Sequence, residues 1–98
     1  MRRNIRAGDG IVEALADIRD RITMRRFIGE VLTPAERRNL ALRWQLMRML
    51  AAGMPQRAIA TRLGISLCKI TRGSAILRQR NSVSRRILRG YTSPSTKE

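Results

Sequence analysis

The arginine side chains are the groups through which this chain of 98 residues is best equipped to bind another molecule. Lys and Arg total 21, of which 19 are Arg, against seven Asp and Glu. Residues 1–36 hold seven basic and six acidic side chains, whereas residues 37–98 hold 14 basic side chains and one acidic one. A surface of one sign attracts a polyanion, and the planar guanidinium group suits phosphates and base edges. The second half therefore predicts nucleic-acid binding, ahead of an acidic membrane or a merely solvated surface.

The remaining reactive side chains argue against catalysis and metal binding. The chain has no histidine, and six of its seven acids lie outside the basic half, so no nucleophile has a neighbouring base. With Cys68 as the single cysteine, the sequence predicts neither a disulfide within the chain nor a His/Cys metal site. No apolar run approaches about 18 residues and no secretory leader is recognisable. We expect a cytoplasmic protein that is neither an enzyme nor bound to a membrane.

The apolar spacing near the start of the chain predicts helices. Ile11, Leu15, Ile18 and Ile22 recur at intervals of four, three and four residues, which is one face of a helix. Together with the apolar residues up to position 32, they indicate two amphipathic helices, or one bent helix, over residues 10–32. A short carboxylate can accept from the free amides of a first turn, so we expect Asp9 to cap the start.

A long apolar helix follows, from residue 34 to residue 52. Thr33 is its predicted N-cap, Pro34 occupies the first helical position, and Glu36 completes a capping box. Between Leu40 and Ala52, only two arginines and one glutamine are polar. A helix that is apolar on nearly every side is buried on several sides. Since a chain this small buries little surface alone, we expect a second copy to cover it.

The remaining segments predict an all-α chain with one folded domain. Helices are expected over about 55–63 and 66–80, separated by Gly64, and a short one is expected to end near Arg89. Ser66 and then Asn81 or Ser82 are their expected caps. We expect a flexible basic arm over residues 1–10, a helical domain over 11–90 and a disordered tail over 91–98.

Residues 56–75 fit a helix-turn-helix, within a motif that we place at 55–80. The motif needs a small residue where its helices cross and a residue that tolerates positive φ at the turn. Ala60 and Gly64 provide them. The buried aliphatic positions are filled by Ile59, Leu63, Ile65 and Ile70. A helical hairpin without function is the alternative, but it would seldom lie in a segment without acids.

In a helix-turn-helix, the second helix places its N-terminal residues at base edges in the major groove of double-stranded DNA. The expected DNA contacts on this helix are Ser66, Leu67, Cys68, Lys69, Thr71 and Arg72. Gln56 and Arg57, which begin the first helix, are expected to hold the DNA backbone. Leu67 and Cys68 can contact a thymine methyl group, and Lys69 and Thr71 can reach base edges or phosphates. We interpret Cys68 as a small neutral side chain and not as a redox sensor.

Four short sequence motifs resemble those of a known family. They are Leu32-Thr33-Pro34-x-Glu36-Arg37, Leu40-x-x-Arg43, Gln56-Arg57 and Ile70-Thr71-Arg72-Gly73-Ser74. Over residues 32–78 the chain resembles the tryptophan repressor family. The resemblance implies an intertwined all-helical homodimer that represses bacterial genes of amino-acid (tryptophan) metabolism at an operator in the nucleoid. It also implies L-tryptophan as a corepressor that sets the spacing of the two reading helices.

The resemblance also implies a ligand site. Arg43 and Arg72 match the two arginines that sandwich the indole, and Arg72 also matches the group that binds the ligand carboxylate. Thr33 matches a pocket residue, and Gly73 matches the glycine that leaves room for the ring. A helix-turn-helix usually has a large aliphatic at this glycine position, and glycine costs a helix roughly 1 kcal/mol against alanine. We therefore expect an empty core slot there, with apolar neighbours such as Met47, which a planar aromatic carboxylate fills.

The chain departs from the family pattern at three places. Ile76 stands where the family has a serine that accepts from the ligand amino group, Glu30 replaces another pocket residue, and the turn after Gly53 is one residue shorter. An ammonium group buried against isoleucine would lack an acceptor. The ligand thus stays open between tryptophan, a related indole acid or another aromatic acid, and none.

Three functions remain as readings of the sequence. The leading one is a ligand-modulated repressor, and the second is a helix-turn-helix DNA-binding protein without a ligand. The third is a basic RNA-binding structural protein, which would ordinarily use stacking aromatics. The chain has only Phe27, Trp44 and Tyr91, and none of them lies within residues 56–80.

Overall fold

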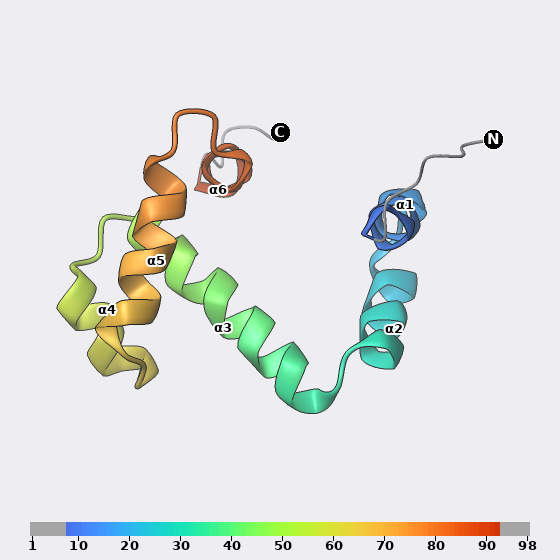
Figure 1. Cartoon of the computed structure of the whole chain (residues 1–98), viewed down its shortest axis with the longest axis horizontal. Helices are drawn as coiled ribbons and strands as arrows, with labels where there is room; N and C mark the ends of the chain where they lie inside the picture. Colours follow the sequence, from blue (N-terminus) through green and yellow to red (C-terminus); the bar gives the residue numbers. More distant parts are fainter. Residues whose placement is uncertain (1–7, 93–98) are drawn as a thin grey trace. The chain divides into compact units, whose positions relative to one another are not determined.

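The fold is all-α, as the sequence predicts. The computed structural model describes residues 8–92, and every regular element in that range is a helix (Figure 1). The helices are α1 (Asp9–Asp17), α2 (Arg21–Val31), α3 (Pro34–Ala51), α4 (Gln56–Leu63), α5 (Leu67–Arg78) and α6 (Val83–Thr92). The chain divides into two compact units, one ending at Arg37 and the other beginning at Arg38.

The N-terminal unit contains two separate helices, not one bent helix. Ile18 adopts an extended conformation after α1, and Asp20 caps α2 by accepting a 2.8 Å hydrogen bond from the Thr23 amide. This bond lowers the pKa of the Asp20 carboxyl below its usual value. The expected cap of α1 is wrong: Gly8 is the N-cap and Asp9 lies in the first turn. The carboxylate at Asp9 still favours the helix there, because it lies near the positive end of the helix dipole.

A capping box starts α3, as predicted. The Thr33 amide donates to Glu36 Oε1 at 2.8 Å, and the Glu36 amide donates to Thr33 Oγ1 at 3.1 Å. Arg37 then donates from Nη1 to the carbonyl oxygens of Gly29 and Leu32, at 3.1 and 3.0 Å. These bonds satisfy carbonyls at the end of α2, so the turn between the two helices is firmly defined.

The apolar stripe of the N-terminal unit lies at the surface of the single chain. Within residues 8–37, no side chain is buried. The large apolar side chains that face solvent in this unit are Ile11, Val12, Leu15, Ile22 and Val31. Their exposure is unusual for a soluble domain, because a contiguous apolar surface generally packs against something.

The C-terminal unit has a true core, to which each of its four helices contributes. Leu46, Met47 and Met49 of α3 pack with Ile59 of α4, Ile70 of α5 and Leu88 of α6. Ile59 and Ile70 are fully buried. Ser82, the second of the two predicted caps, starts α6 by accepting from the Arg85 amide at 3.1 Å.

The predicted ends of the domain need correction. Asp9 and Gly10, expected in the flexible arm, belong to α1, and α6 continues past Arg89 to Thr92. The first two residues of the expected tail are therefore helical. Helices commonly extend or fray by one or two residues at their ends without a strong local signal, and their boundaries are therefore hard to place from sequence. The predictions for residues 1–7 and 93–98 lie outside the described residues.

Candidate nucleic-acid interface and ligand pocket

The tight turn between α4 and α5 sets the position of the second helix. Gly64 ends α4 with a positive φ of 65°, a conformation that strains residues with a Cβ atom. Ser66 then caps α5, its hydroxyl accepting from the Lys69 amide at 3.4 Å. Only Ile65 and Ser66 separate the turn from α5, so the two helices form a compact helix-turn-helix.

The first two turns of α5 present the predicted DNA-contacting side chains to solvent. Ile70 faces the core, while its neighbours in this part of the chain are exposed: Ser66, Leu67, Cys68, Lys69, Thr71 and Arg72. At the start of α4, Arg57 is exposed and Gln56 is half-buried. Leu67, at the N-terminus of α5, is 46% exposed, which leaves apolar surface available for a contact with another molecule.

The electrostatic field around α5 is positive. No Asp or Glu occurs in residues 38–92, so carboxylates within that range do not offset the positive charge of this part of the chain. The N-terminus of α5 adds free amides and a partial positive charge beside Lys69. This combination attracts a phosphate backbone to the exposed end of the helix.

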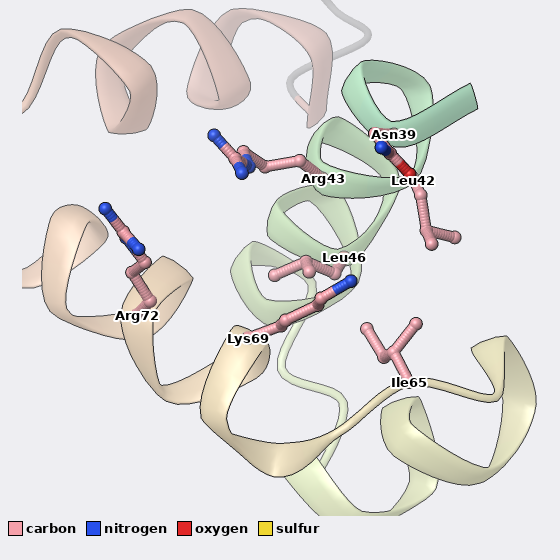
Figure 2. A pocket seen from close by; sticks show the side chains of 7 residues that line it. All are labelled: Asn39, Leu42, Arg43, Leu46, Ile65, Lys69 and Arg72. Atoms are coloured by element: carbon pink, nitrogen blue, oxygen red, sulfur yellow. The ribbon is translucent and has the colours of Figure 1, made fainter. Parts of the chain in front are cut away.

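A pocket of about 190 Å³ lies beside this exposed end (Figure 2). Its walls come from α3, from α5 and from the turn before α5: Asn39, Leu42, Arg43, Leu46, Ile65, Lys69 and Arg72. The guanidinium groups of Arg43 and Arg72 extend from α3 and α5 on the same side of Leu46 (Figure 2). The pocket thus combines three cations with apolar walls, an arrangement that suits an anion with an apolar body.

The empty slot expected at Gly73 is not present in the single chain. Gly73 is buried, and a Cβ atom built on it would lie 2.6 Å from Leu46 Cδ1 and 3.4 Å from Met47 Cγ. The missing side chain therefore lets α5 approach α3 closely, and side chains of α3 fill the space. The expectation of a void there is wrong, because it assumed that the facing helix keeps an ordinary packing distance.

Of the other predicted ligand residues, some line the pocket, some lie in the core beside it, and one belongs to the N-terminal unit. Arg43 and Arg72 line the pocket, and Met47 lies against Gly73 in the core beside it. Ile76 is half-buried against the core and does not line the pocket. Thr33 belongs to the N-terminal unit, where its side chain makes the capping box.

Sequence reasoning did not assign five of the residues that line the pocket to a ligand site. Asn39, Leu42 and Leu46 lie on one face of α3 with Arg43, at helical spacings of three and four residues. That spacing was the available signal on α3. Ile65 was predicted only as a core residue, and Lys69 only as a DNA contact.

The comparison with known families gives one match. A family model described as "Trp repressor protein" matches residues 8–91, which is most of the chain. No curated protein and no solved structure matches. Among the described residues, no helix combines the length and the apolar character needed to cross a membrane.

Proposed function

The chain belongs to the Trp repressor family, whose members are DNA-binding regulators and not enzymes, and from this premise we propose a specific mode of action. The protein acts as a homodimeric repressor that reads an operator with α5. A small aromatic acid in the pocket between α3 and α5 adjusts that helix. The observation that carries the proposal is that Lys69 and Arg72 belong both to the exposed end of α5 and to the pocket.

The DNA-binding part of the proposal rests on exposure and charge. The side chains that a helix-turn-helix directs at base edges are exposed here on α5, and no acid lies within residues 38–92. Lys69 and Thr71 would read base edges, whereas Gln56 and Arg57 would hold phosphates. Binding to an operator would place the protein in the cytoplasm, at the nucleoid. An RNA-binding structural role is less well supported, because the helix-turn-helix carries no stacking aromatic.

The ligand part of the proposal follows from the chemistry of the pocket. Members of the family bind tryptophan as corepressor. Here, Arg43 and Arg72 can stack on a planar ring and pair with a carboxylate, while Leu42 and Leu46 supply an apolar wall. No acidic side chain lines the pocket to receive an ammonium group. We therefore assign the site to L-tryptophan or a related indole acid, with weak discrimination between the two.

The dimer is proposed from the surface that a single chain leaves uncovered. The apolar side chains of α1 and α2 face solvent, and so does Leu40 of α3. On α6, Val83 and Ile87 are also exposed. A second copy of the chain is the partner that supplies matching apolar surfaces, and a two-fold interface would bury both sets at once.

The decisive experiment measures the affinity for a duplex that the protein itself selects from a random pool. The affinity is compared without ligand and with about 1 mM tryptophan or amine-free indole acid, the upper end of ordinary metabolite affinities. Both compounds should raise the affinity of the wild type and should have no effect on Arg43→Gln. Arg48→Gln removes an exposed charge of α3 that does not line the pocket, and should respond like the wild type. If neither compound changes the wild-type affinity, the protein is a ligand-independent DNA-binding protein.

A further inference from the structure

A second cavity, of about 350 Å³, lies toward the C-terminal ends of α3 and α5. Its walls include the apolar side chains of Leu50 and Leu77 and the hydroxyl of Ser74. Three arginines also line it: Arg78 of α5, and Arg85 and Arg89 of α6. Neither the predicted DNA contacts nor the first pocket uses any of these side chains.

Two of these arginines are held in place by the chain. Arg85 donates from Nη1 to the Leu77 carbonyl and from Nη2 to the Arg80 carbonyl, both at 2.9 Å. Arg78 donates from Nη1 to Ser74 Oγ at 2.7 Å. Each guanidinium group has five N–H donors, so these bonds fix its position and leave donors for a ligand. Side chains that are already fixed lose less entropy when they bind an anion.

Within residues 38–92, no acid is present to offset the charge of Arg78 and Arg85. Three guanidinium groups around one cavity favour a ligand with more than one negative charge. Because arginine forks match phosphate oxygens in a bidentate way, a phosphate group fits better than a single carboxylate.

The exposed apolar residues of α6 point away from this cavity. At 100° per residue, Val83 and Ile87 lie on the side of α6 roughly opposite to Arg85. A second copy of the chain that covers Val83 and Ile87 would thus leave the arginine face open. The cavity also lies at the other end of α5 from the residues Leu67 to Arg72, which are proposed to contact DNA.

We propose that this cavity is a second ligand site, which binds the phosphate group of a small molecule through Arg78, Arg85 and Arg89. It is independent of the ligand proposed for the first pocket, since it shares no residue with that pocket. The site requires no reaction, only the displacement of water and counter-ions from the three guanidinium groups.

Titration calorimetry with inorganic pyrophosphate, at constant ionic strength and without DNA, tests the proposal. The wild type should show saturable binding at one site per chain. Arg78→Gln and Arg89→Gln should each weaken the affinity about tenfold or more. Arg85 is left unchanged because its hydrogen bonds support the end of α5. Circular dichroism should show that both variants keep the helical content of the wild type.

Matched controls separate this site from the general charge of the surface and from the first pocket. Arg48→Gln removes an exposed arginine that lines neither cavity, and Arg43→Gln alters the first pocket alone. Both should bind pyrophosphate as the wild type does, and a saturating DNA duplex should not displace it. The proposal is overturned if no saturable binding occurs, if Arg48→Gln or Arg43→Gln loses as much affinity as Arg78→Gln, or if the duplex releases the pyrophosphate.

Discussion

The close approach of α5 to α3 depends on the absence of a side chain at Gly73. A leucine there would overlap Leu46, since even a Cβ atom would lie 2.6 Å from Leu46 Cδ1. Overfilling a packed core generally costs about 1–3 kcal/mol, so Gly73→Leu should lower the free energy of unfolding by that amount. Urea unfolding followed by circular dichroism measures the loss.

A double-mutant cycle identifies the cause of that loss. In a Leu46→Ala background the new side chain has room, so Gly73→Leu should cost about 0.5–3 kcal/mol less than in the wild type. If the two changes are additive, Leu46 does not restrict position 73 and the close contact is not what the glycine provides.

Lys69 is the side chain whose role in DNA binding is easiest to separate from general attraction. It is exposed on the first turn of α5, and its amide is fixed by the Ser66 cap. If it reads a base, Lys69→Ala should cost about 1–3 kcal/mol on the selected duplex and little on random DNA. Fluorescence anisotropy with both duplexes measures this. An equal loss on the two duplexes would instead identify Lys69 as a phosphate contact.

At the residue scale, the sequence predicts which functional groups are available better than it predicts which side chains pack against each other. The arginines of the pocket, Arg43 and Arg72, follow from short motifs whose spacing along a helix is fixed. The side chain that packs against Gly73 cannot be predicted from a short motif in the same way. It depends on the distance at which two helices cross, and that distance depends on which side chain of α3 lies beneath the glycine.

At the element scale, the helix caps make one pH dependence predictable. The Thr23 amide lowers the pKa of the exposed Asp20 carboxyl in the folded state. A lowered pKa means that Asp20 stabilises the fold above its unfolded value, about 3.9, and that this stabilisation disappears as the pH falls through the folded value. Serine also caps helices but does not titrate. The difference in melting temperature between the wild type and Asp20→Ser should therefore be constant near neutral pH. At pH values below about 4, the wild type should lose stability relative to Asp20→Ser.

Both proteins contain the other five acids that precede Arg37, so comparing the two proteins at each pH isolates the contribution of Asp20. A constant difference in melting temperature from neutral pH down to about pH 2 would contradict the cap, because the carboxylate would then be equally protonated in both states.

The elements that the sequence predicts best are those with local start and stop signals. The capping box of Thr33 and Glu36, the turn at Gly64 and the caps Ser66 and Ser82 all lie where the residue types require them. The separation of α1 from α2 was left open, because its signal is the single carboxylate of Asp20. A hydrogen bond between residues three positions apart can be predicted from the residue types. The last turn of α6 has no such capping residue to mark its end.

At the scale of the whole molecule, the separation of charge along the chain predicts a strong effect of salt on DNA binding. Residues 37–98 carry 14 basic side chains and one acidic one. If three to five cations of each subunit contact phosphates, a dimer makes about 6–10 contacts, and its affinity should fall about 10³–10⁵-fold between 50 and 200 mM salt. Arg57→Gln should reduce the slope of the logarithmic salt plot by about one for each subunit. An affinity that does not depend on salt would exclude this electrostatic mode.

The exposed apolar surface makes a prediction about the assembly. No side chain is buried within residues 8–37, and Ile22 of α2 is 69% exposed in the single chain. Two such helices bury too little apolar surface to offset the entropy of folding by themselves, and the dimer proposed above would supply the missing burial. The melting temperature should therefore rise with protein concentration, as expected when folding and association are coupled.

A matched pair of variants on α2 then distinguishes association from helix propensity. Ile22→Gln should weaken the dimer and lower the melting temperature, because it places an amide where the partner would bury an isoleucine. Arg26→Gln changes an exposed polar side chain of the same helix and should leave the dimer intact. Analytical ultracentrifugation measures both. A wild-type chain that sediments at micromolar concentration as a folded species of 11.2 kDa would show that the exposed stripe has some other partner. If Ile22→Gln and Arg26→Gln weaken the dimer equally, then α2 contributes charge and not apolar surface to the interface.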